Sequence, residues 1–177
     1  MLVFLSFLKF THLLSLLLWV GSIFFFSFIA APIIFKALPR EKAGDLIGQI
    51  FPKYWILGYL LSLLALFSLI GTFLIERSSS FASSLPSYLQ GHLDIDYPFP
   101  LTRFIIILLM VFIAYYSGLV IGKKAVKIKA LIRAEDNAKK KEALRGTFKK
   151  IHAVSAILNM SLFFLGLVLV HFTALKL

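Results

Sequence analysis

The sequence predicts an all-α integral membrane protein, built as a single four-helix bundle. Of the 177 residues, 60% are hydrophobic and 15% are charged, and the mean hydropathy is +0.92, whereas a soluble domain is only about half apolar. The apolar residues gather in four runs, and a helix needs about 20 such residues to cross a bilayer. We therefore expect one domain over residues 1–177, with spans at about 10–35, 54–75, 104–122 and 151–172.

The first apolar stretch, residues 1–38, is longer than a bilayer core requires. We expect it to tilt, or to protrude at one end where the Lys9 ammonium would reach the interface. Pro32 predicts a kink near the last turn of this helix. The linker at 39–52 places its apolar residues at helical spacing, which predicts a short interfacial helix that ends at Pro52.

Two polar segments separate the remaining spans. Residues 76–103 are rich in Ser and Pro, which predicts a long polar loop. Residues 123–150 carry eleven Lys and Arg against Glu135, Asp136 and Glu142, so this segment has a net charge of 11 − 3 = +8. We expect it to be a basic third loop that leads into the fourth span.

The distribution of basic residues predicts the orientation in the membrane. Loops one and three are basic, whereas the 76–103 loop holds only Arg77 and Arg103. Cytoplasmic loops carry an excess of Lys and Arg, so we expect a multi-pass protein of the cell (inner or plasma) membrane, with loops one and three cytoplasmic and both termini outside. Residues 123–150 would then contact anionic lipid, which accounts for the charge without a nucleic-acid partner. The first run is too long for the apolar core of a cleaved signal peptide.

The polar residues within the spans form two matching triplets. The offsets +3 and +7 put the members of each triplet on one helical face, and ionisable groups inside a span are candidates for a functional site. One interpretation is a polar seam that lines a binding cavity, and the other is hydrogen bonding that holds helices together. The triplets are His12, Ser15 and Trp19 in the first span, and His152, Ser155 and Asn159 in the fourth.

Metal and haem sites are the other candidates. His171 lies about 28 Å along the helix from His152, which returns it to the depth of His12, so His12 and His171 could hold a b-type haem or a metal between two helices. His92, Asp94 and Asp96 form a weaker candidate metal site in the polar loop. No Asp or Glu lies in any predicted span and the chain has no cysteine, so we expect no enzymatic activity. The sequence does not determine which cofactor, if any, the protein binds.

Small residues on the second and third spans predict close helix packing. They offer a surface for a second copy of the chain or for a partner in a membrane complex. These residues are Gly58, Ser62, Ala114, Gly118 and Gly122.

Three motifs together resemble the transmembrane-protein-205-like family of small four-span membrane proteins. They are His12 with Trp19-Val20-Gly21, the stretch from Leu38-Pro39-Arg40 to Phe51-Pro52-Lys53-Tyr54, and the stretch from Leu144-Arg145 through Lys149-Lys150-Ile151-His152 to Asn159. The resemblance implies a four-helix membrane fold and, more remotely, similarity to the copper-resistance D-type membrane proteins. It assigns no catalytic residue, because that family has no agreed activity.

Two functions follow from these patterns. The first is a non-enzymatic membrane protein for the transport or tolerance of a small molecule or metal, with the polar seam as its binding site. The alternative is an accessory or haem-b-binding subunit of a larger, respiratory-type membrane complex.

Overall fold

The computed structural model describes residues 2–83 and 98–175, and these residues form helices joined by tight turns. Four helical stretches in the described part are long and apolar enough to cross a bilayer: Leu2–Ala37, Arg40–Arg77, Leu101–Ala134 and Ala138–Ala174. The predicted all-α four-helix membrane fold is therefore confirmed. Helices are the expected solution because a bilayer core offers no water to satisfy backbone N–H and C=O groups.

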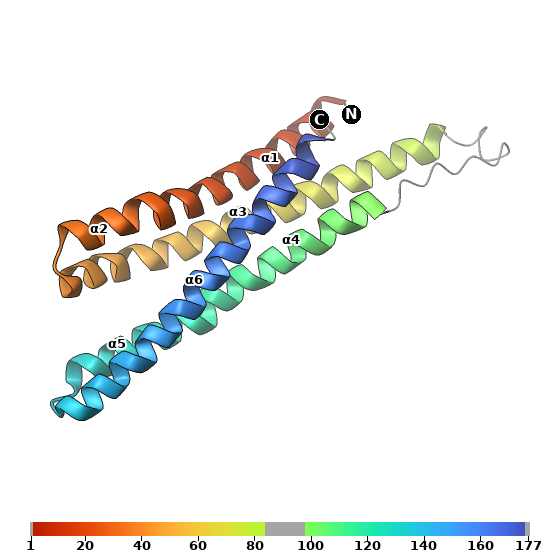
Figure 1. Cartoon of the computed structure of the whole chain (residues 1–177). Helices are drawn as coiled ribbons and strands as arrows, with labels where there is room; N and C mark the ends of the chain where they lie inside the picture. Colours follow the sequence, from red (N-terminus) through yellow and green to blue (C-terminus); the bar gives the residue numbers. More distant parts are fainter. Residues whose placement is uncertain (1, 84–97, 176–177) are drawn as a thin grey trace.

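The first two stretches form a helical hairpin. α1 (Leu2–Phe24), the π-helical turn η1 (Phe25–Ala30) and α2 (Ala31–Ala37) follow one another directly, and α3 (Arg40–Ser83) returns alongside them (Figure 1). Pro32 lies in the first turn of α2, immediately after the π-helical turn. A proline has no N–H to donate and clashes with the carbonyl four residues earlier, so the change of helical type occurs where the sequence predicts a kink.

The interfacial helix predicted for loop one is not a separate element. Arg40 to Phe51 instead form the first turns of α3, which continues through Pro52. The rings of Phe51 and Trp55 stack across this proline with centroids 5.5 Å apart. Proline removes one backbone hydrogen bond, and packing on both sides of it preserves the helix.

The second hairpin also differs from its predicted boundaries. α4 (Pro98–Tyr116), the π-helical turn η3 (Ser117–Gly122) and α5 (Lys123–Ala134) run one way, and α6 (Ala138–Ala174) returns. The basic segment 123–150 is therefore mostly helical rather than a loop, since Lys, Arg, Ala and Leu are good helix formers. Asn137 begins α6 as its N-cap and accepts from the Lys139 and Lys140 amides at 3.0 and 3.1 Å. The predicted loop 76–103 likewise shortens, because α3 extends to Ser83 and α4 begins at Pro98.

The two hairpins pack together around one apolar interior. α1 contacts α3 and α6, and α4 contacts the same two helices. Gly166 of α6 lets Val20 of α1 and Met110 of α4 approach its backbone. The outside of the bundle is also apolar: Phe67, Phe112 and others are more than 60% exposed. A helix bundle that is apolar both inside and outside fits a lipid environment.

Figure 1 shows that the bundle has two distinct ends. The chain termini lie at one, which we call the terminal end, and the turns at 38–39 and 135–137 lie at the other, which we call the turn end. The two hairpins diverge toward the turn end, where long charged side chains bridge them. Lys129 Nζ lies 2.8 Å from the Gly44 carbonyl oxygen and 2.7 Å from Asp45 Oδ1, and Arg133 also pairs with Asp45.

Candidate functional site

The first predicted triplet lies inside the bundle. His12, Ser15 and Trp19 are each at most 3% exposed, and they share the interior face of α1 with Leu16 and Ile23. His12 Nδ1 lies 2.8 Å from the Ala65 carbonyl oxygen of α3. A carbonyl only accepts hydrogen bonds, so Nδ1 carries the proton and, in the neutral ring, Nε2 carries a lone pair. Nε2 is buried and finds no hydrogen-bond partner among the described residues.

The second triplet is arranged differently. His152 is exposed, whereas Ser155 and Asn159 are half-buried. Asn159 Oδ1 accepts a hydrogen bond from the Tyr54 hydroxyl across a distance of 3.3 Å. The end of α2 and the start of α6 both lie at the turn end (Figure 1). At 1.5 Å per residue, His12 is about 37 Å from the end of α2, and His152 is about 21 Å from the start of α6. The two histidines therefore lie at different depths of the bundle.

The other sequence candidates are the possible haem and metal sites. His171 is exposed beside the ring of Phe172, whereas His12 is buried, and the haem or metal site between them stays a prediction. His92, Asp94 and Asp96 lie outside the described residues. Within residues 2–83 and 98–175, the side chains that are described include no group of three or more His, Cys, Asp or Glu suited to a metal.

The predicted partner surface is covered by contacts within the chain. Ser62 and Ala114 are 0% and 7% exposed, and Gly118 and Gly122 are buried. Gly58 lies beside the Trp19 indole nitrogen. A Cβ at Gly118 or Gly122 would overlap the rings of Tyr59 or Trp55 of α3. These small residues therefore allow α3 to approach α4 and η3.

A second set of polar residues gathers at the terminal end of the apolar interior, and we call it the polar layer. Each of the four long helices contributes to it. Ser68, Thr72 and Thr173 are at most 8% exposed, like His12. The members are His12 of α1, Ser68 and Thr72 of α3, Arg103 of α4 and Thr173 of α6.

Helix register explains why Arg103 faces into the bundle. Met110 and Gly166 pack against each other in the interior, and Arg103 and Thr173 lie seven residues, or two turns, beyond them toward the terminal end. Arg103 Nη2 lies 3.5 Å from Thr173 Oγ1. Arg103 Nε is buried and has no hydrogen-bond partner in the described part of the chain.

The polar layer contains charged side chains that interact with one another and hydroxyl groups that already donate hydrogen bonds. The positive charge of Arg103 interacts electrostatically with His12, and the negative charge of Glu76 interacts electrostatically with Arg103. Glu76 also forms an ion pair with Lys9 at 3.0 Å, at the rim of the layer. The Ser68, Thr72 and Thr173 hydroxyls donate to carbonyls of their own helices at 2.6, 2.9 and 2.8 Å. Each hydroxyl proton is therefore already donated to a backbone carbonyl, and the hydroxyl oxygens can still accept hydrogen bonds through their lone pairs.

Arg103 is the residue that sequence reasoning missed. The sequence places it in the polar loop, because Pro98 and Pro100 precede it. One signal could have revealed it: Lys9, Glu76 and Arg103 are charged residues at the ends of three successive apolar runs. In an antiparallel bundle such positions lie at one depth, where charged groups are expected to pair.

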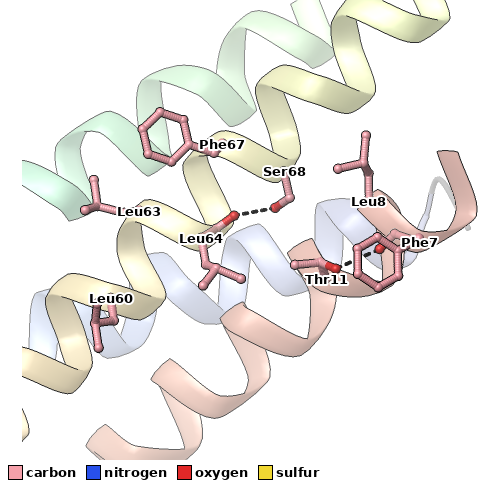
Figure 2. A pocket seen from close by; sticks show the side chains of 8 residues that line it. All are labelled: Phe7, Leu8, Thr11, Leu60, Leu63, Leu64, Phe67 and Ser68. Atoms are coloured by element: carbon pink, nitrogen blue, oxygen red, sulfur yellow. Dashed lines mark hydrogen bonds between the residues drawn. The ribbon is translucent and has the colours of Figure 1, made fainter. Parts of the chain in front are cut away.

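A groove opens on the lipid-facing surface beside the polar layer (Figure 2). It lies between α1 and α3 and has a volume of about 330 Å³. The Thr11 and Ser68 hydroxyls lie on its wall and donate to the Phe7 and Leu64 carbonyls. The lining residues are Phe7, Leu8, Thr11, Leu60, Leu63, Leu64, Phe67 and Ser68.

Ser68 belongs to both the groove and the polar layer. Its hydroxyl lies 3.1 Å from the Ala65 carbonyl oxygen, which is the same oxygen that His12 Nδ1 contacts. The groove is otherwise apolar and open on the lipid side, where Phe67 is 64% exposed. This arrangement could hold an apolar chain in contact with lipid, with its end close to polar side chains.

Comparisons with known proteins identify a family but no activity. A stretch of 55 residues, 31% of the chain, is 47% identical to an uncharacterized protein of Aquifex aeolicus (strain VF5). The match covers 40% of that relative's length. No solved structure matches. Neither comparison names the transmembrane-protein-205-like or copper-resistance families, so both resemblances stay predictions. The model of the family described as a domain of unknown function (DUF4149) matches residues 14–134, and the chain belongs to this family.

Proposed function

We propose that this multi-pass membrane protein is non-enzymatic and binds small apolar molecules dissolved in the bilayer, in order to transport them or to confer tolerance of them. The observation that carries the proposal is the groove between α1 and α3. Its volume of about 330 Å³ is at the lower end of the range typical of small-molecule sites. Its lining is apolar apart from two hydroxyls, and it opens where lipid chains would lie.

The position of the groove supports entry from the membrane rather than from water. Leu60, Leu64 and Phe67 are 57%, 47% and 64% exposed on the outer face of α3. A molecule of low polarity concentrates in hydrocarbon, so it would reach the groove without crossing a headgroup layer. Sites of this kind hold their ligands mainly through apolar contacts, and a few polar groups orient the ligand.

Filling the groove tests this proposal. In vesicles that contain the purified protein, Leu64→Trp is expected to weaken binding of methyl decanoate on the order of tenfold, because the indole would occupy the site. Leu57→Trp is the matched control, since Leu57 is also on α3 and is 43% exposed, but does not line the groove. Equal binding by both variants and the wild type would contradict the proposal. Co-purification with a membrane complex, or a Soret band, would favour the accessory-subunit alternative instead.

We further propose that the turn end faces the cytoplasm of the cell membrane and that residues 123–150 contact anionic lipid. The supporting observation is that helices α5 and α6 carry the basic residues on exposed faces, where anionic headgroups would attract them. The terminal end, with both chain termini, would then be outside.

Cysteine labelling measures this orientation directly, because the chain has no cysteine of its own. In intact cells, a Lys139→Cys variant is expected to stay unlabelled by a membrane-impermeant maleimide until the membrane is opened, since Lys139 is at the turn end. A Leu175→Cys variant at the terminal end is expected to react at once. The reverse pattern of labelling would show the opposite orientation.

A further inference from the structure

The polar layer contains two buried nitrogen atoms that no described residue satisfies. They are Nε2 of His12 and Nε of Arg103. Leaving a buried polar atom without a partner costs about 1–3 kcal/mol, and more for a charged group. Both atoms belong to one layer, and the two side chains interact electrostatically. The layer is therefore incomplete in a way that a bound group could correct.

The missing group must satisfy two opposite requirements. Arg103 Nε–H is a donor and needs an acceptor oxygen. His12 Nε2 carries a lone pair in the neutral ring, because Nδ1 donates to Ala65, so it needs a donor. The neighbouring hydroxyls supply no free proton, since each donates to its own helix. A carboxylic acid carries both functions, with a carbonyl oxygen that accepts and an O–H that donates.

We propose that the polar layer binds the carboxyl group of an amphipathic weak acid, whose apolar chain lies in the groove. The carbonyl oxygen accepts from Arg103 Nε–H, and the acid O–H donates to His12 Nε2. No covalent bond forms or breaks. The inference rests on the proposed function, because the groove is the site of the apolar chain, and it adds the chemical class of the ligand.

The connection between groove and layer supports a single ligand that reaches both. Ser68 lines the groove and shares the Ala65 carbonyl with His12, and Thr11 of the groove wall precedes His12 in α1. A hydrogen bond to a charged group is worth about twice a neutral one, so Arg103 would hold the carbonyl oxygen of an acid or an ester, and His12 Nε2 would favour the acid because only the acid has an O–H to donate. The neutral acid form also enters hydrocarbon at a lower cost than its ion.

The test compares decanoic acid with methyl decanoate, which has the same ten-carbon acyl chain but no O–H. For the full chain in vesicles, we expect decanoic acid to bind about tenfold more tightly than the ester. Arg103→Gln is expected to weaken binding of both probes, because the acid and the ester each carry the carbonyl oxygen that Arg103 Nε–H would contact. Arg77→Gln is the matched control, because Arg77 is an exposed arginine at the same end of the bundle and its loss removes the same charge.

Three further measurements distinguish direct recognition of the carboxyl group from misfolding and indirect effects. His12→Gln is expected to reduce the acid preference independently of Arg103. In the wild-type protein labelled with nitrogen-15, the His12 Nε2 resonance is expected to shift with decanoic acid and to stay in place with methyl decanoate. Acetate is expected not to compete, because it lacks the chain that the groove would hold.

The outcomes separate this inference from the proposed function. Equal binding of acid and ester by the wild type, or equal effects of Arg103→Gln and Arg77→Gln, would overturn the acid site and leave the apolar groove standing. Failure of both probes to bind would overturn the proposed function as well. Competition by acetate at decanoic-acid concentrations would show that the carboxyl group alone is recognised, which would contradict an amphipathic ligand.

Discussion

The Gly122→Ala variant is expected to lose about 2 kcal/mol of unfolding free energy, because its new methyl group has no space. A Cβ at Gly122 would overlap the ring of Trp55, with Cζ2 and Cζ3 only 2.6 and 2.8 Å away. A bulky indole cannot move aside as a flexible chain does, and overpacking of this kind costs about 1–3 kcal/mol. Alanine itself favours a helix over glycine by about 1 kcal/mol, so any net loss reports the clash.

Unfolding by sodium dodecyl sulfate in mixed micelles measures this effect. Gly21→Ala is the control, since a Cβ at Gly21 meets nothing within 4 Å, and it is expected to be neutral or slightly stabilising. Replacing Trp55 with Leu in the Gly122→Ala background is expected to restore part of the lost stability, because the two changes occupy one contact. Additive losses in the double variant would show that the clash with Trp55 is not the cause.

The Leu169→Ala variant is expected to lose roughly 2 kcal/mol, or more where the site does not collapse. Leu169 is 0% exposed and belongs to the apolar interior between α6 and its neighbours. In soluble proteins, Leu→Ala costs about 2–5 kcal/mol through lost transfer energy and a cavity. In a bilayer the separated helices remain in hydrocarbon, so the transfer part is small and the lost packing contacts decide the result.

Leu167→Ala provides the comparison for this prediction. Leu167 is two residues away on the same helix but is 43% exposed, so its side chain faces lipid. Lipid chains can fill the space that alanine leaves, and we expect a change within about 0.5 kcal/mol. Equal losses of unfolding free energy at 167 and 169, in the same detergent-unfolding assay, would contradict the prediction that the buried leucine contributes more to stability than the lipid-facing one.

The prediction of the site was less complete than that of the fold, and particular residues show why. His12, Ser15 and Trp19 were found because helical spacing puts them on one face, and that face is buried. His152 has the same spacing to Ser155 and Asn159, yet it is exposed. Spacing within one helix states which residues share a face and says nothing about whether that face meets another helix or lipid.

The helix boundaries also differ between the sequence-based prediction and the structure. The sequence pattern predicts a helix end at Pro52 and a loop over 123–150, but helix continues through Pro52 and over most of the basic segment. Proline lowers helix propensity by an amount that packing can override, whereas the lysines and arginines of 123–150 favour a helix although their charge makes the segment resemble a loop. The Phe51–Trp55 stack and the pairing of Lys129 with Asp45 supply such contacts from residues that the pattern does not connect.

The sequence by itself determined that the chain is an all-α membrane protein, because long apolar runs can only cross a bilayer with their backbone hydrogen bonds made internally. The tertiary structure alone decided that His12 and Arg103 belong to one polar layer and that a groove adjoins it. Those residues are 91 positions apart (103 − 12) and on helices of different hairpins. Their proximity depends on the rotation and register of whole helices, which are determined by packing at Gly118, Gly122 and Gly166.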